Sequence, residues 1–344
     1  MPARRLTVIA SVALTLATGC TSASSTGPVT SMSSTPTSAA SPAEPSGPDP
    51  TGRPVPTASP APPQGSIVFN VEFGPDGDTY KNVYTIRPDG SGFRMLTNAP
   101  TGFNAEPAWT TDGRVVYVIE DPRDVDVSHL YRMDAMGGNR TQLTSGAGYV
   151  GGPAVSPDGR SIAFSFDPVD GPASIHLARI DGSHATAITT PPADAEDGDW
   201  FPTFSPDGSQ VAFQRDHALE VVNVDGTGLR QILPATAGVW RPRWSPDGRL
   251  ILFEVQGDGP LAGHLETVEL TGAGTSGKVT DLGRGGGPDW SPDGRFIVFQ
   301  RWLEGTAHIG LVVANADGTH PVEIWRTPER TDIFIAGSDW GSAP

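Results

Sequence analysis

One short motif recurs along most of the chain and constrains the fold more than any other feature. Each copy reads x-Pro-y-aromatic followed by Ser-Pro-Asp-Gly, or a close variant, at residues 106–113, 152–159, 201–208, 241–248 and 287–294. The final glycines of successive copies are 46, 49, 40 and 46 residues apart. A period of this length is typical of an array of supersecondary units, each of which needs its neighbours to cover its apolar surface.

Each repeat predicts four β-strands, named A to D. Strand A contains the first proline, and Ser-Pro-Asp-Gly makes the turn to strand B, because proline presets φ, aspartate accepts amide hydrogen bonds and glycine takes positive φ. A second Asp-Gly turn, as at Asp225-Gly226, joins strands C and D. Strand B is apolar at consecutive positions, as in 115–118 and 250–253, so we expect neighbouring sheets to cover both of its faces.

The two ends of the repeat region complete each other. The first unit has predicted strands B, C and D at 67–69, 83–86 and 94–96, whereas 336–341 is a strand A with no strand B after it. Trp340 lies 50 residues after Trp290, in step with the repeat. Joining the ends predicts an all-β, six-bladed β-propeller of four-stranded antiparallel blades over 65–344, in which the C-terminal strand A completes the N-terminal blade. An open solenoid is the alternative architecture.

The repeated motif resembles the PD40 repeat, a WD40-like repeat of TolB-type propellers, over the whole of 65–344. The resemblance implies an extracytoplasmic protein that contacts other proteins in the bacterial envelope. The chain departs from the motif at Val155 and Phe204, which replace tryptophan, and at Thr110 and Thr111, which replace Ser-Pro. TolB-type proteins carry an additional N-terminal domain where this chain has a low-complexity segment, so the resemblance does not identify a specific partner.

The first 64 residues have the composition of an export signal followed by a tether. Arg4 and Arg5 precede an apolar stretch over 6–18, which is shorter than the roughly 20 residues that a membrane-spanning helix needs. Residues 16–20 resemble the bacterial lipobox, which implies a lipoprotein signal peptide over 1–19 and a lipid on Cys20. From Cys20 to residue 64 we expect a disordered linker, because residues 21–64 are almost entirely Ser, Thr, Pro, Ala and Gly. A plain secretory signal, with Cys20 incidental, is the alternative.

The charge balance restricts the partners of the chain. With 39 acidic and 23 basic residues the net charge is −16, which disfavours nucleic acid and anionic lipid surfaces as partners. We therefore expect membrane contact only through the lipid on Cys20, and a monomeric propeller. The alternative is that the acid excess only keeps an exported protein soluble. Cys20 is the single cysteine, which excludes an intramolecular disulfide and a cysteine-based metal cluster.

The predicted topology sorts the connections onto two faces. The A–B and C–D turns lie on one face, and turn geometry is a sufficient reason for their repeated aspartates. The longer B–C and D–A loops lie on the other face, where function is more often found. The candidate binding residues on this loop-rich face are Glu120, Asp121, Asp124, Asp126, Asp167, Asp170, Asp194, Glu196, Asp197, Asp199, Trp200 and Trp240.

The carboxylates of the loop-rich face indicate either a calcium site or a solvated acidic rim, since the spacing over 194–199 does not fit an EF-hand loop. Trp200 and Trp240 are either exposed binding residues or part of the core. Four histidines lie near the start of strand C in separate blades, too far apart to share one ion: His129, His176, His264 and His308.

These features together predict a binding protein rather than an enzyme. The sequence contains no Gly-x-Ser-x-Gly nucleophile motif, and we expect no cofactor apart from calcium. The predicted function is that of a membrane-anchored, extracytoplasmic, non-catalytic scaffold that binds an envelope or extracellular protein, a peptide or a glycan. The alternative is a cation-assisted lyase or hydrolase that acts in the propeller channel.

Overall fold

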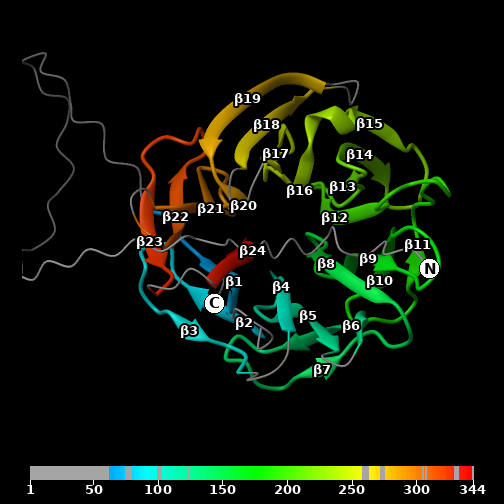
Figure 1. Ribbon diagram of the computed structural model, residues 1–344, viewed down its shortest axis with the longest axis horizontal. Coiled ribbons are helices and arrows are strands. Elements are labelled where there is room, and N and C mark those ends of the chain that lie inside the picture. Colours follow the sequence, from blue (N-terminus) through cyan, green and yellow to red (C-terminus); the bar gives the residue numbers. More distant parts are fainter. Residues whose placement is uncertain are drawn as a thin grey trace, which may run out of the picture. The chain divides into compact units, whose positions relative to one another are not determined.

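A computed structural model of the chain (Figure 1) describes residues 62–73, 80–98, 103–121, 124–257, 263–271, 276–303, 306, 308–328 and 333–342. The predicted signal peptide and Cys20 lie outside these residues, as does nearly all of the predicted linker. Regular structure in the described ranges is β-sheet, apart from one 3-10 turn at Ala235–Ala237. The described residues contain no helix that is long and apolar enough to cross a membrane.

The strands follow the predicted order A, B, C, D along the chain. The A strands are β4 (Phe103–Trp109), β8 (Tyr149–Val155), β12 (Asp199–Phe204), β16 (Val239–Trp244), β20 (Gly286–Trp290) and β24 (Ile333–Gly341). The B strands are β1 (Ser66–Phe73), β5 (Val115–Asp121), β9 (Ser161–Asp167), β13 (Gln210–Arg215), β17 (Leu250–Val255) and β21 (Phe296–Trp302). The C strands are β2 (Tyr80–Ile86), β6 (Asp124–Met133), β10 (Ser174–Arg179), β14 (Ala218–Asn223), β18 (His264–Leu270) and β22 (Ile309–Asn315). The D strands are β3 (Arg94–Met95), β7 (Thr141–Gln142), β11 (Thr186–Ala187), β15 (Arg230–Leu233), β19 (Ser276–Arg284) and β23 (Val322–Arg326).

The strands pair into antiparallel sheets arranged around a central axis, with the A strands innermost (Figure 1). Four of these sheets contain four strands each. The remaining sheet contains eight, because one parallel bridge between Lys81 and Phe103 joins the unit β24-β1-β2-β3 to the unit β4-β5-β6-β7. The propeller fold is therefore confirmed. Strand pairing by itself yields five sheets, and the number of six blades stays a prediction from the repeat.

The C-terminal strand closes the ring as predicted. Strand β24 pairs antiparallel with β1, and Ile67 lies opposite Trp340. The Trp340 indole donates a hydrogen bond to the carbonyl of Gln64 at 2.9 Å. On its other sides β24 is held by two aspartates, since Asp289 accepts the Trp340 N–H at 2.6 Å and Asp339 accepts the Trp109 N–H at 2.8 Å. Because closure pairs the first strand with the last, it protects an edge that would otherwise be open to other chains.

Apolar side chains fill the spaces between neighbouring sheets. In β5 the side chains of Val115 and Tyr117 pack toward β1 and β2, whereas Val116 and Val118 pack toward β9. All four residues are fully buried. The consecutive apolar residues of strand B are thus covered on both faces, which confirms the prediction.

The Ser-Pro-Asp-Gly turns are closed by their own side chains. At residues 205–210 the Ser205 hydroxyl donates to Asp207 at 2.6 Å and accepts the Gln210 N–H at 2.9 Å, while Asp207 accepts the Ser209 N–H at 3.0 Å. The same bonds recur at Ser156, Ser245 and Ser291. Hydrogen bonds lower the pKa of Asp207, so its carboxylate stays charged. The structural role predicted for these aspartates is confirmed.

Each A strand carries a bulge at one position, which the repeat did not reveal. The pairing register between A and B strands shifts there, and the residue at the bulge has a positive φ. The bulge residues are Glu106 (48°), Gly152 (57°), Phe201 (55°), Arg241 (46°), Gly287 (54°) and Gly337 (56°). Residues other than glycine rarely adopt this backbone conformation. Glu106, Phe201 and Arg241 are therefore strained positions that the surrounding sheet must hold in place.

Candidate functional site

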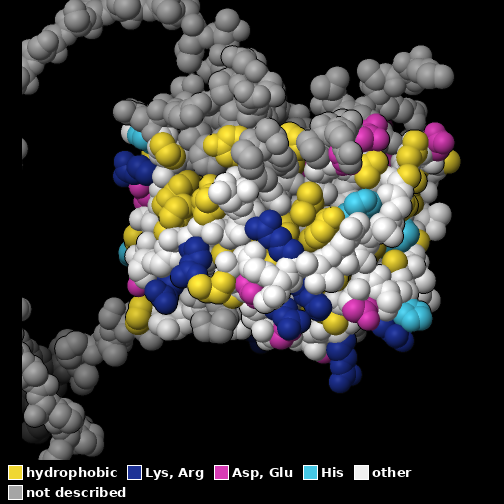
Figure 2. Space-filling view, turned by 90° about the horizontal axis from the view of Figure 1, so that it is seen from below, with side chains coloured by type: hydrophobic (Ala, Val, Ile, Leu, Met, Phe, Trp, Pro, Cys, Tyr) yellow, Lys and Arg dark blue, Asp and Glu magenta, His cyan; other side chains and the backbone are white. Residues whose placement is uncertain are grey.

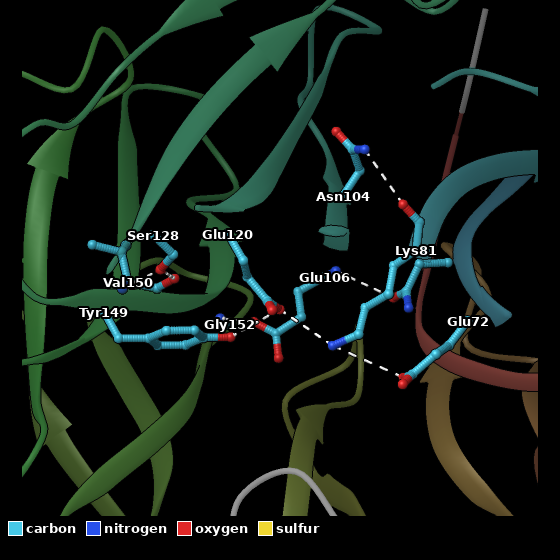
Figure 3. A network of polar contacts seen from close by, with 10 residues as sticks. Glu72, Lys81, Asn104, Glu106, Glu120, Ser128, Tyr149, Val150 and Gly152 are labelled. Carbon is cyan, nitrogen blue, oxygen red and sulfur yellow. Dashed lines mark hydrogen bonds and ion pairs between the residues drawn. The ribbon is translucent and has the colours of Figure 1, made fainter. Parts of the chain in front are cut away.

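A buried ammonium group lies among carboxylates at the loop-rich ends of B and C strands in the first two blades of the chain (Figure 3). Lys81, at the start of strand β2, places its Nζ 3.2 Å from Glu120 Oε1 and 3.9 Å from Glu72 Oε2. Glu72 and Glu120 come from the ends of strands β1 and β5. B strands end and C strands begin on the same side of the sheet, so the topology brings these three side chains together.

Two residues extend this network toward the axis. The Tyr149 hydroxyl, from the start of β8, donates to Glu120 Oε1 at 3.3 Å. The bulge residue Glu106 accepts the Gly152 N–H through Oε2 at 2.5 Å. We name the five residues Glu72, Lys81, Glu106, Glu120 and Tyr149 the axial network (Figure 3).

The charges of the axial network do not balance. Burial opposes the charge of Lys81, but Glu120, Glu72 and Glu106 outweigh burial, so the pKa of Lys81 is raised. Burial raises the pKa of Glu120 by more than Lys81 lowers it. Burial and the two glutamates Glu106 and Glu120 also hold the pKa of the Tyr149 hydroxyl well above its usual value. The Lys81 ammonium lies within 4.0 Å of two carboxyl groups and is also attracted by the charge of Glu106, so Lys81 stays protonated while its acidic neighbours compete for it.

An aromatic cluster adjoins the axial network. The Trp200 ring lies 6.0 Å from Tyr149 and 6.2 Å from Phe201, and Phe201 lies 5.7 Å from Trp240. The Trp200 indole donates to the Asp197 carbonyl at 2.9 Å. Trp200 and Trp240 are 5% and 9% exposed. The expectation that they are exposed binding residues is therefore wrong. The core alternative holds, because both indole rings pack against the buried ring of Phe201.

Two predicted loop carboxylates are instead buried within strands. Glu120 is 3% exposed in β5, where it pairs with Lys81. Asp199 is 0% exposed in β12 and receives two hydrogen bonds from Arg215, at 2.6 and 2.8 Å. Their placement on exposed loops is wrong, because the strands extend further than the repeat motif indicated and each carboxylate meets a cation that is distant in sequence.

The other predicted site residues lie nearer the surface. Asp124, Asp170, Asp194 and Glu196 are exposed, while Asp121, Asp126, Asp167 and Asp197 are half-buried. Asp197 lies 3.9 Å from His217 Nε2. In the view of Figure 2, basic side chains lie mainly in the lower half and at the left, whereas acidic side chains lie both among them and at the upper right edge. The structure thus separates the predicted acidic face into buried, paired carboxylates and scattered exposed ones.

The strand-C histidines have separate surroundings, as predicted. His176 packs against Phe164 and Phe166, His264 lies 3.1 Å from Glu266, and His308 hydrogen-bonds to the Thr327 carbonyl at 2.7 Å. Across the part of the chain that the structure describes, no three His, Cys, Asp or Glu side chains are grouped as metal ligands. The calcium hypothesis stays a prediction.

Sequence reasoning missed most of the axial network. Lys81 carried one usable signal, since it is one of only two lysines in the chain. Glu106 and Arg241 could have been recognised as the charged residues at the position before proline in the motif. Tyr149 and Glu72 carried no signal that set them apart.

Comparison with known proteins places this geometry in context. Residues 126–328 match the PD40 family model, described as the TolB beta propeller domain. An uncharacterized protein of Agrobacterium fabrum is 36% identical over 149 residues, which are 43% of this chain and 46% of the relative, so the match spans less than half of that protein. TolB of Acinetobacter baumannii has a TM-score of 0.62 at 19% identity, over 80% of this chain and 66% of that chain. A structure described as TolB of Agrobacterium tumefaciens has a TM-score of 0.59 at 18% identity, over 81% of this chain and 99% of that chain.

Proposed function

Because the matching model covers more than half of the chain, the protein belongs to the TolB beta propeller (PD40) family, and we propose from this premise that it is a lipid-anchored binding scaffold of the bacterial envelope. Its partner in this proposal is a protein or a peptide segment that approaches the loop-rich face near the axis. The propeller presents the binding residues and carries out no reaction on the partner.

The observation that carries the proposal is the axial network beside the aromatic cluster. Both lie where A strands begin and B strands end, on the side from which the longer loops leave. A partner segment that reached these strands would meet the half-buried Glu72, Glu106 and Tyr149, which lie above the buried Lys81 ammonium and beside the buried aromatic cluster.

The exposed acidic residues of the neighbouring loop would change the rate at which a partner associates more than the affinity of the complex. Asp194 and Glu196 are exposed in the connection that leads into β12. Charges at an interface rim mainly change the association rate and its salt dependence. We therefore expect a partner with a basic or mixed surface.

Attachment to the membrane is assigned to Cys20 in this proposal. The wild-type chain should partition into the detergent phase of a Triton X-114 extract of the expressing bacterium, and the Cys20→Ser chain should remain in the aqueous phase. Equal partitioning of the two chains would contradict lipid attachment at Cys20.

The binding role is tested by crosslinking in cells with the full-length, anchored chain. A photo-crosslinking amino acid replaces Glu196 on the loop-rich face in one sample and Glu269, an exposed residue of β18, in a matched control. The expected result is a discrete crosslinked partner from the Glu196 position and none from the Glu269 position. The same products from both positions, or none from either, would refute the proposed face.

A further inference from the structure

The exposed apolar side chains of the propeller gather on one side of it. Among the described residues seven large apolar side chains are exposed, and five of these lie in C–D turns or at the start of D strands: Phe93, Met95, Met136, Leu229 and Val322. These positions belong to the face that carries the A–B and C–D turns, which we name the turn side. Single exposed apolar residues are common, whereas a group of them on one side marks a contact surface.

Three of these side chains form one patch with arginines at the outer edge of the first two blades. Phe93 and Met95 lie at strand β3, and Met136 lies in the turn before β7; both strands are outermost in their blades (Figure 1). Arg94 Nη1 lies 2.7 Å from Met136 Sδ, so the patch continues from one blade to the next. Phe93, Met95 and Met136 are 44%, 43% and 66% exposed. We define the turn-side patch as Arg87, Phe93, Arg94, Met95, Met136 and Arg140, all of them exposed.

Basic residues outnumber acidic ones around the turn-side patch. The turns and strand ends of the two blades on this side contain five arginines and three aspartates: Arg87, Arg94, Arg114, Arg132, Arg140, Asp89, Asp112 and Asp134. The aspartates are occupied by their own turns, as Asp134 accepts two backbone N–H groups at 2.8 and 2.9 Å. The ion pairs described on the turn side join an arginine of an A–B turn to the aspartate of the same turn, and the patch arginines take part in none of them.

The acid excess of the chain lies on the opposite, loop-rich side. A B strand such as β5 has seven residues and therefore separates the two sides by about 20 Å. Salt screens exposed charges over about 8 Å at physiological ionic strength. An anionic surface beside the turn-side patch would thus interact with the local arginines rather than with the net charge of −16. The expectation of membrane contact only through Cys20 rests on that net charge, which averages two unlike sides.

The chain enters the propeller on the turn side. Strand β1 begins at Ser66, whose hydroxyl lies 2.8 Å from the Thr85 hydroxyl, two residues before Arg87. Residues 21–64 would therefore join a lipid on Cys20 to the side that carries the patch. Attachment of this kind keeps the domain near the bilayer, so that a weak contact suffices to orient it.

We propose that the turn-side patch docks on an anionic phospholipid bilayer. The arginines would contact the phosphates, while Phe93, Met95 and Met136 would enter the headgroup region, since basic residues beside exposed apolar ones are typical of surfaces that lie on membranes. Docking in this way turns the loop-rich face away from the membrane and toward a partner. The inference rests on the proposed lipid attachment only for the high local concentration of lipid.

Amide hydrogen exchange of the full chain reconstituted into vesicles tests the docking. Vesicles of phosphatidylcholine alone are compared with vesicles that contain about one-third phosphatidylglycerol, each at low and high sodium chloride concentration. With phosphatidylglycerol at low salt, we expect exchange over 87–95 and 134–142 to slow by about threefold or more and exchange over 190–198 to stay unchanged. High salt should reverse the slowing.

Three results of this comparison would overturn the proposal. The first is equal exchange over 87–95 and 134–142 in the two lipids. The second is equal slowing on the turn side and over 190–198. The third is slowing that appears without vesicles and grows with protein concentration, because it would indicate that a second copy of the chain covers the patch.

Matched variants separate the patch from a general effect of charge. Arg87→Gln combined with Arg94→Gln should remove the slowing. The control combines Arg249→Gln with Arg295→Gln, at turn-side arginines of other blades whose side chains are 83% and 43% exposed, and should keep the slowing. Slowing that persists in the first pair, or that is lost in both pairs, would overturn the assignment.

A further variant tests the apolar part of the patch. Met136→Ser, at the most exposed of the three apolar side chains, should raise the phosphatidylglycerol content that gives half of the slowing by about twofold or more. An unchanged requirement would overturn the insertion of the apolar side chains.

The failure of this proposal differs from the failure of lipid attachment. If Cys20→Ser leaves the detergent partitioning unchanged, and the Cys20→Ser chain mixed with excess phosphatidylglycerol vesicles still shows the slowing, lipid attachment is refuted and the docking surface stands. If partitioning depends on Cys20 but no lipid slows the exchange, the docking surface alone is refuted.

Discussion

Asp289, one of the two aspartates that hold the closing strand, should make the free energy of unfolding decrease as the pH rises from 4 to 7. Asp289 is 8% exposed and accepts the Trp340 N–H, with Arg243 Nε 3.6 Å from its other oxygen. Burial and the nearby charge of Asp339 raise the pKa of Asp289 to about 7. The folded state therefore binds this proton more tightly than the unfolded chain, where the pKa is near 3.8. Stability from this group is fully present below about pH 4 and is lost as the pH rises through 7.

The size of the effect follows from the rise in pKa. At about 1.4 kcal/mol per pKa unit, a rise from 3.8 to about 7 corresponds to a loss of at most about 4 kcal/mol between pH 4 and pH 8. Asp289→Asn removes the charge but keeps a side-chain oxygen that accepts the Trp340 N–H. It also removes the partner of Arg243, which reduces the gain. We expect the variant to be more stable than wild type at pH 8, by about 1–3 kcal/mol, and close to wild type at pH 5.

Urea unfolding followed by tryptophan fluorescence measures this difference. Wild type and Asp289→Asn, both carrying Cys20→Ser, are compared at pH 5, 6, 7 and 8. Groups that do not interact with Asp289 titrate alike in the two proteins and cancel, so the difference reports Asp289 together with Asp339, whose charge acts on it. Asp247→Asn is the control without a slope: burial is outweighed by hydrogen bonds and Arg249, which lower the pKa of Asp247 below 3.8, so this variant should differ from wild type by a constant amount between pH 5 and pH 8. A difference between wild type and Asp289→Asn that stays constant with pH, or that favours wild type increasingly as the pH rises, would refute the reasoning.

Three further predictions concern the paired carboxylates, the turns and the calcium hypothesis. Asp199→Ala leaves Arg215 buried without its two hydrogen bonds, so it should lower the free energy of unfolding in urea by about 3–5 kcal/mol. Asp170→Ala, at an exposed position, is the control and should lower it by less than about 0.5 kcal/mol. Ser205→Ala removes the hydroxyl that bonds Asp207 and the Gln210 N–H and should cost about 1 kcal/mol, and an unchanged midpoint would contradict the role given to the turn. If the exposed acids bind calcium, calcium should raise the melting temperature and a chelator reverse it, whereas identical melting curves would exclude a calcium site in the folded domain.

The sequence by itself determined the elements whose causes are local. The Pro-Asp-Gly turns and the order of strands A to D follow from chemistry that each repeat carries locally. The pairing of Trp340 with Ile67 follows from the repeat count, because the first unit lacks a strand A and the last strand A lacks a strand B. Strand B could be recognised as buried on both faces because consecutive apolar residues such as Val115 and Val116 leave no polar face for water.

Only the tertiary structure decided which polar residues meet. Lys81 pairs with Glu120, 39 residues away, and Asp339 accepts a hydrogen bond from Trp109, which lies 230 residues earlier in the sequence. Such contacts depend on how neighbouring sheets pack, and no periodicity within a strand encodes a partner in another sheet. The bulges at Glu106 and Arg241 likewise became visible only in the tertiary structure, because each places a residue other than glycine at a positive φ that the local sequence disfavours.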